Sequence, residues 1–257
     1  MVTTVEFDRL RLVSNTRAWL RGRDGAAPDG DPAMFRSGRP GAFHNGVSRL
    51  AEVDIDTAIT NARAYFPGVS WLWWCGDDSR PGVAGELAAR GATPAFEMPV
   101  MAARLENTVA APEPVGLAIE EVTTGEALAE WTRTYQAGMS TDPEDFDAVL
   151  RSEQSRSDAQ GTYRRFLGRV DGRGVATSAV LLTDEVSGLY VVGVDPLFRN
   201  RGYGTAMSAA ALAAARSAGA RIATLQARGR AQPIYERLGF VTVSRYQLFS
   251  LGSEAAR

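Results

Sequence analysis

The residues best suited to chemistry lie in one stretch, Val-Asp-Pro-Leu-Phe-Arg-Asn-Arg-Gly-Tyr-Gly-Thr at positions 194–205. A hydrophobic segment precedes it and an alanine-rich segment follows it, so the stretch is predicted to join a strand to a helix. The amide N–H groups of such a turn point in one direction, and the start of the helix adds partial positive charge. Gly202 and Gly204 allow the backbone to approach a ligand closely, while Arg199 and Arg201 add charge. The stretch therefore predicts a site for a phosphate, and a diphosphate suits it best.

Other phosphate-binding patterns fit the same stretch less well. A dinucleotide fingerprint needs a third glycine where Met207 stands, and an acidic residue after the next strand, where the chain has Gln-Ala-Arg at 226–228. A loop of the Gly-Lys-Ser/Thr type needs a lysine, and the chain has none. A plain strand-to-helix turn without a ligand is the remaining alternative.

The composition excludes several classes of enzyme. All 28 basic residues are arginine, so there is no lysine to form a Schiff base or to act as a general base. With His44 and Cys75 as the single residues of their kinds, a His/Cys metal cluster and a Cys-His nucleophile are not expected. The net charge of −2 gives no sign of a broad nucleic-acid surface. No stretch has the length and hydrophobicity of a membrane span or a secretory signal, and we expect a cytoplasmic protein.

The hydrophobic patterns predict a mixed α/β fold with two halves. Residues 1–108 form the first domain, 109–115 a linker that carries Pro112 and Pro114, and 116–257 the second domain. In the first domain we expect helices at 1–20, 54–66 and 83–90, and strands at 33–36, 43–50, 69–75 and 95–105. In the second we expect helices at 125–139, 143–155, 205–218 and 232–238, and strands at 117–122, 162–170, 174–182, 188–194, 221–227 and 240–251, the last as one or two strands.

Two motifs in the second half resemble a known family. Arg199-x-x-Gly202-x-Gly204, preceded by Val194-x-Pro196, resembles the central motif of the GCN5-related N-acetyltransferases (GNAT). The segment Ala-Gln-Pro-Ile-Tyr-Glu-Arg-Leu-Gly-Phe at 231–240 resembles the second signature of that family. The two motifs occur in the family's order, one helix and one strand apart. The resemblance implies the GNAT acyl-coenzyme A N-acyltransferase fold over the second half.

The same resemblance implies a co-substrate and a role for each matching residue. The co-substrate would be acetyl-coenzyme A, with no metal. The pantetheine would pair with a strand that diverges from the strand at 222–226, and an amide of the first strand would polarise the thioester carbonyl. Tyr235 would protonate the departing thiolate, unless it only packs in the core. The residues implied to bind coenzyme A are Val192, Gly193 and Val194 for the pantetheine, and Arg199, Asn200, Arg201, Gly202, Tyr203, Gly204 and Thr205 for the diphosphate.

Two features of the second half leave alternatives open. Many GNAT members have an asparagine that helps to hold the pantetheine where this chain has Arg228, which reads either as a phosphate contact or as a solvated strand end. The base that accepts the proton of the amine is not identified by the motifs. Asp195, Glu153, Asp184 and Glu185 are candidates, and a chain of water molecules would also serve.

The first half is interpreted as a degenerate GNAT-like copy, as in tandem members of the family. Its elements over 54–105 follow the order of those over 205–251 when Gly91 is aligned with Gly239. The strand 43–50 then takes the place of 188–194. An unrelated domain with the same order of elements is the alternative.

Two substitutions indicate that this copy binds no coenzyme. The segment 51–54 replaces the turn rich in arginine and glycine, and its Glu52 and Asp54 would repel a diphosphate. Leu87 stands where Tyr235 stands in the second half, and it has no hydroxyl. We therefore expect one coenzyme per chain.

Three functions compete at this point. The leading one is an acetyl-coenzyme A-dependent N-acetyltransferase, in which the primary amine of a small molecule attacks the thioester directly. The alternative is a non-catalytic acyl-coenzyme A-binding module that regulates a partner. Acetylation of protein tails would require an acidic groove, and the sequence has no long acidic run to build one. The expected partner is a small-molecule amine, with no nucleic acid and no membrane, and a homodimer is a possible assembly.

Overall fold

The computed structural model describes residues 6–22, 30–39, 41–109, 111–112, 114–139, 145–156, 158 and 161–251. Its contacts divide the chain into two compact units. The first unit consists of residues 1–101, 226–228 and 242–257, and the second of residues 102–225 and 229–241, as far as these are described. The units do not coincide with the two halves of the sequence, because the first unit includes β10 from the second half and the second unit includes the last residues of β4. The predicted domain limits at 108 and 116 therefore stay a prediction.

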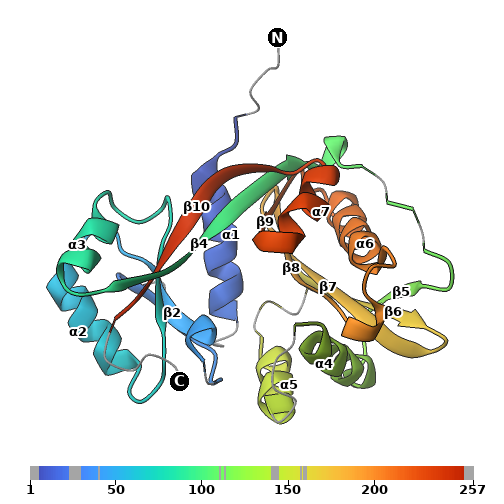
Figure 1. Ribbon diagram of the computed structural model, residues 1–257, viewed down its shortest axis with the longest axis horizontal. Helices are drawn as coiled ribbons and strands as arrows, with labels where there is room; N and C mark the ends of the chain where they lie inside the picture. The colour runs from blue at the N-terminus through green and yellow to red at the C-terminus, as the bar shows by residue number, and fades with distance from the viewer. Residues whose placement is uncertain are drawn as a thin grey trace. The chain divides into compact units, whose positions relative to one another are not determined.

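In the first unit the strands follow the order β1-β2-β3-β10-β4, with β1 and β2 antiparallel, β2 and β3 parallel, and β3 and β10 antiparallel (Figure 1). A 3-10 turn, Ala42–His44, precedes β2. The elements are α1 (Arg9–Gly22), β1 (Ala33–Arg36), β2 (Asn45–Arg49), α2 (Ile55–Tyr65), β3 (Leu72–Cys75), α3 (Val83–Ala89), β4 (Thr93–Arg104) and β10 (Val241–Ser250).

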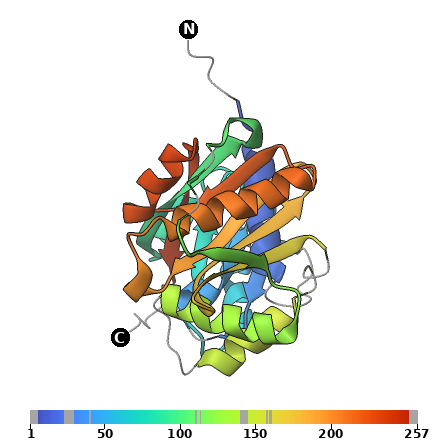
Figure 2. The ribbon, with the colours of Figure 1, turned by 90° about the vertical axis from the view of Figure 1, so that its right-hand side faces the viewer.

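In the second unit the order is β9-β8-β7-β6-β5, and the end of β4 lies next to β9. Helix α6 contacts β6, β7 and β8 from one side, and α4 contacts β7 and β8 from the other (Figure 1, Figure 2). The elements are β5 (Ala118–Glu121), α4 (Gly125–Met139), α5 (Phe146–Gln154), β6 (Tyr163–Val170), β7 (Arg173–Thr183), β8 (Val186–Val194), α6 (Tyr203–Ser217), β9 (Ile222–Gln226) and α7 (Gln232–Arg237).

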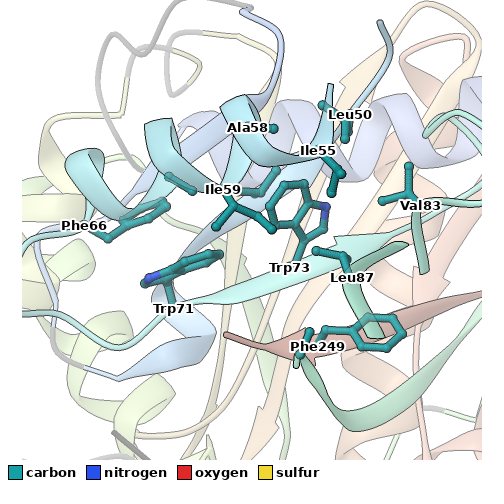
Figure 3. Packing of buried hydrophobic residues seen from close by; sticks show 13 residues of the cluster. Leu50, Ile55, Ala58, Ile59, Phe66, Trp71, Trp73, Val83, Leu87 and Phe249 are labelled. Carbon is teal, nitrogen blue, oxygen red and sulfur yellow. The ribbon is translucent and has the colours of Figure 1, made fainter. Parts of the chain in front are cut away.

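The core of the first unit forms beneath α2. The apolar face of this helix, with Ile55 and Ile59, packs on Trp71 and Trp73 of the β3 segment (Figure 3). Phe249 of β10 reaches the same cluster, so a strand from the far end of the chain completes this core. Fully burying one large apolar side chain contributes about 2 kcal/mol. Trp71, Trp73 and Trp74 are therefore buried residues of the core.

The two halves of the sequence build the same arrangement. The series β2-α2-β3-α3-β4 repeats as β8-α6-β9-α7-β10, and in each case the first two strands are parallel. Beside the second parallel strand of each series lies the last strand of the other series, with β10 next to β3 and β4 next to β9. The alignment of the halves made on element order thus has a direct counterpart in the strand order.

The predicted elements are confirmed, with shifts at their ends. Helix α4 has the predicted bounds, and the final strand is one strand, β10. The first helix begins at Arg9 because the Asp8 carboxylate accepts the amides of Leu10 and Arg11, as an N-cap does. The predicted start of α5 at 143 lies outside the described residues. Among the helices that the structure describes, none is both long and apolar enough to cross a membrane.

Cys75 provides a test of the packing in the first unit. Burial raises the pKa of its thiol to about 12, and only the thiolate reacts quickly with disulfide reagents. At pH 8 we expect the native protein to react at least about a hundredfold more slowly than the chain unfolded in guanidinium chloride. Absorbance of the released reagent measures both rates. Equal rates would show that the thiol is accessible in the folded chain.

Candidate active site

The turn that joins β8 to α6 alternates between ordinary and left-handed backbone. The Asp195 carboxylate accepts a hydrogen bond of 3.0 Å from the amide of Leu197 and caps the 3-10 helix Pro196–Phe198. Asn200 (φ 62°) and Gly202 (φ 80°) are left-handed. Gly202 is the N-cap residue of α6, and no side chain of the described structure caps this helix. Such a turn aims successive amide N–H groups into one concavity, which suits an anion.

The charge of the turn is positive. Arg199 and Arg201 are exposed on it. Its one acidic residue, Asp195, is buried and forms a 2.8 Å ion pair with Arg173 of β7. The carboxylate of Asp195 therefore does not offset the two exposed arginines, and an anion that approaches the turn meets a favourable field.

The side chain of Arg199 also forms hydrogen bonds with two backbone segments. Its guanidinium donates to the carbonyl of Val194 at 3.2 Å and to the carbonyl of Gly138, near the end of α4, at 3.1 Å. A Cβ atom at Gly138 would lie 2.9 Å from the carbonyl carbon of Gly193 and 2.9 Å from the amide nitrogen of Val194. The end of α4 thus covers the end of β8, and only glycine at 138 permits this approach.

Strand β8 diverges from β9, as the family resemblance implied. Residues 186–188 pair with residues 222–224, and the parallel pairing of the described strands ends there. A bulge follows, because the register on β7 shifts between Thr177 and Ala179. Val191 has a φ of 54° in this bulge, which is unfavourable for a β-branched residue. A bulge bends its strand, so residues 192–194 lie on the part of β8 that has left β9.

Tyr235 lies buried on α7, where its ring packs edge-to-face on Phe240 with the ring centres 6.0 Å apart. Burial raises the pKa of its hydroxyl to about 12, although a hydrogen bond with the side chain of Ser208 acts in the opposite direction. Ser208 in turn donates to the carbonyl of Gly204 at 2.8 Å. The predicted acid is therefore linked through Ser208 to the first turn of α6, and it keeps its proton across the neutral range.

Two side chains that shape this region were not predicted from the sequence. The buried Thr177 hydroxyl donates to the carbonyl of Val191 at 2.9 Å and so holds the bulge. Ser208 connects Tyr235 to α6. The sequence did indicate its position, because Ser208 follows Gly204 by four residues and therefore lies on the same face of the predicted helix. Thr177 gave no such signal, because threonine is common in strands.

The four carboxylates considered as general bases differ in their surroundings. Asp195 and Glu153 are buried and engaged in ion pairs, with Arg173 at 2.8 Å and Arg165 at 2.8 Å. The structure also places Asp184 in a turn with φ 50°, and Glu185 3.4 Å from Arg221 at an exposed position. The assignment of the base stays open between them and water.

Arg228 is exposed at the end of β9, in the residues that belong to the first unit. The guanidinium carbon lies 4.1 Å from the centre of the Phe96 ring, a cation–π contact. The exposed position agrees with the second of the two alternatives, a solvated strand end. The functional roles of all the residues above stay predictions.

Comparisons with known proteins relate part of the second half to a known family. Residues 160–242 match the family model of the acetyltransferase (GNAT) domain. The fold resembles a GCN5-related N-acetyltransferase from Kribbella flavida with a TM-score of 0.72 and 20% identity, covering 98% of both chains. A GCN5-related N-acetyltransferase from Sphaerobacter thermophilus has a TM-score of 0.61 and 21% identity, covering 76% of this chain and 64% of that one.

A third similar structure is a tandem GNAT protein from the clavulanic acid biosynthesis pathway, with a TM-score of 0.60 and 14% identity over 77% of this chain and 69% of that chain. No curated protein matches the sequence. The structural likenesses establish the fold, which is a mixed α/β GNAT fold, and one of the similar proteins has two GNAT domains in tandem.

The contact between Gly138 and β8 leads to a prediction. Gly138→Ala should displace α4 or the end of β8, because the added Cβ would meet backbone atoms that cannot turn aside. We expect coenzyme A to bind about tenfold more weakly, measured by calorimetry. Gly125→Ala is the matched control at the other end of the helix, where a Cβ would have no atom within 4 Å. Equal affinities of the two variants would contradict a positioning role for this contact.

Proposed function

We propose, on the premise that residues 160–242 are a GNAT acetyltransferase domain, that the chain transfers an acetyl group from acetyl-coenzyme A to the primary amine of a small molecule. Acyl transfer from acetyl-coenzyme A is the reaction of the family. The observation that carries the proposal is the divergence of β8 from β9 directly beside an uncapped helix start. The predicted domain of 116–257 contains every residue to which we assign a role.

The diphosphate is proposed to bind at the turn before α6. Backbone amides of residues 199–204 and the side chain of Thr205 would donate to it. Supporting this, the left-handed residues Asn200 and Gly202 give the turn a concave row of amides, and α6 begins without a side-chain acceptor. Arg201 lies over the ring of Phe198, with 5.3 Å between its guanidinium carbon and the ring centre, which holds a positive charge beside the turn.

The pantetheine is proposed to bind along the diverging part of β8. An extended chain can add to an exposed strand through main-chain hydrogen bonds. Val192, Gly193 and Val194 lie beyond the last pair with β9, so this edge of β8 offers such a strand. The close packing of Gly138 on Gly193 fixes the position of the strand from the other face.

The reaction requires that a neutral amine attack the thioester carbonyl carbon and then lose a proton to a carboxylate or to water, that the carbon–sulfur bond break, and that the thiolate receive a proton. We assign the polarisation of the carbonyl oxygen to an amide near Val194. We assign the proton to the hydroxyl of Tyr235. A hydroxyl whose pKa burial raises to about 12 is fully protonated at neutral pH and is therefore available as a donor.

Gly204 tests the diphosphate site. Gly204→Glu should abolish the binding of acetyl-coenzyme A, because it places bulk and negative charge where the phosphates are proposed to lie. Gly204→Ala is the control, since a Cβ there would lie 3.5 Å from the Val194 side chain, an ordinary contact. Calorimetry compares the two. Unchanged affinity in Gly204→Glu would reject this site.

Tyr235 tests the assignment of the acid. Tyr235→Phe keeps the packing and removes the proton donor, so we expect kcat to fall by about tenfold to a thousandfold with little change in coenzyme affinity. Tyr246→Phe removes another buried hydroxyl, which donates to the carbonyl of Val13 in the first unit, and should leave kcat unchanged. Release of coenzyme A over a panel of amines gives the rates.

Two results of the same assay would oppose the proposal. An unchanged kcat in Tyr235→Phe would assign protonation to another group or to water. Binding of acetyl-coenzyme A without turnover of any amine would favour a regulatory binding module. In the active enzyme, the raised pKa of Tyr235 also predicts no loss of kcat from its ionisation below about pH 10.

A further inference from the structure

The turn that follows β2 in the first unit already holds an anion, and this anion is a side chain of the protein. The carboxylate of Asp31 accepts the amide of Ala51 at 2.8 Å, that of Glu52 at 2.6 Å and that of Val53 at 2.8 Å. This turn joins β2 to α2. It is therefore the counterpart of the turn that joins β8 to α6 in the second unit.

The donors at the start of α2 are also satisfied within the chain. Asp54 is the N-cap residue, and its carboxylate accepts the amides of Asp56 at 3.1 Å and Thr57 at 2.9 Å. Two carboxylates thus take up five amide donors of the turn and the helix start. In the second unit the N-cap residue is Gly202, and no side chain in the described structure caps α6.

The strand register shows that the difference lies at equivalent places. Ala33 of β1 pairs with Arg49, the last residue of β2, and Ala176 of β7 pairs with Val194, the last residue of β8. Two residues before Ala33 the chain has Asp31. Two residues before Ala176 it has Gly174, which follows Arg173. The acidic side chain of the first unit is thus replaced by a glycine next to an arginine in the second.

Asp31 is ionised at neutral pH. Partial burial raises the pKa of its carboxyl, but the hydrogen bonds from the three amides and the charge of Arg49 lower it, and the pKa lies below its usual value. A carboxylate with several amide donors is a strong acceptor. The first turn therefore binds a full negative charge in the folded chain.

We infer that residues 51–53 form an oxyanion site that Asp31 occupies as an internal substitute for phosphate, and that Asp31 thereby restricts coenzyme binding to the second unit. The proposal rests on the proposed function for its second clause only. It also changes the reason for a single coenzyme per chain. Repulsion by Glu52 is not needed when the amides already have an acceptor.

The experiment removes the internal anion and offers inorganic phosphate in its place. It is done in the Gly204→Glu background, so that phosphate binding at the second unit does not contribute. Asp31→Ala should lower the melting temperature by about 5 °C, because three amides lose their acceptor. Replacing sodium chloride by sodium phosphate at equal ionic strength should then raise it by about 2 °C or more in this variant, and by less than about 1 °C in the background protein.

Two further variants keep the test decisive. Glu52→Ala removes one negative charge from the same turn, but it does not remove an acceptor of the turn amides. Its melting temperature should therefore neither fall nor rise with phosphate. Asp31→Asn replaces Asp31→Ala in the test if the alanine variant does not fold. It keeps one acceptor oxygen without the charge, so its melting temperature should fall less and phosphate should raise it by the same amount. In amide spectra, the signals of Ala51, Glu52 and Val53 should shift with phosphate only when Asp31 is replaced.

The outcomes separate this inference from the proposed function. An unchanged melting temperature in the Asp31 variants, or a loss that phosphate restores no better than chloride, would overturn the internal substitute. Two coenzymes bound per wild-type chain would overturn the restriction. Absence of any coenzyme binding by the wild type would instead reject the proposed function, and the recovery by phosphate would still stand.

Discussion

Amide N–H groups at a strand-to-helix turn have no acceptor within the helix, so each needs a side chain, a water molecule or a ligand. In the first unit Asp31 and Asp54 provide the acceptors, so that turn is complete without a ligand. In the second unit Gly202 is the N-cap residue of α6, and no side chain in the described structure caps this helix. Hydrogen bonds to a charged group stabilise a fold by about 2 kcal/mol each. The second unit forgoes that stabilisation, and an external anion would restore it.

The rest of the candidate site is held by contacts of the main chain. Gly138 and Gly193 bring α4 against β8 with no side chain between them. Arg199 joins the carbonyls of Val194 and Gly138. Thr177 satisfies the carbonyl of Val191 in an unfavourable conformation. These contacts leave β8 little freedom to move, so the geometry that would receive a ligand exists before the ligand arrives.

The sequence predicted those parts of the fold that depend on neighbours along the chain. The helical period and its flanking residues gave α4 its bounds, and Gly202 and Gly204 marked the turn before α6. The bulge at Val191 was not predictable, because it depends on how β8 pairs with β7. The hydrogen bonds of Asp31 with the amides of residues 51–53 were not predicted for a similar reason, because Asp31 and Ala51 are twenty residues apart in the sequence. The place of β10 between β3 and β4 is also a long-range feature, and an alternating pattern of apolar residues does not identify the partner of a strand.

The place of β10 has a consequence for synthesis on the ribosome. Domains that are continuous in sequence can fold as soon as they emerge, with the N-terminal one first. Here the first unit needs Phe249, which packs in its core, and Leu248, which is buried beside it in β10. Until β10 has been translated, the edge of β3 and the apolar surface beneath α2 stay open. The half of the chain that is made first is therefore the half whose core closes last.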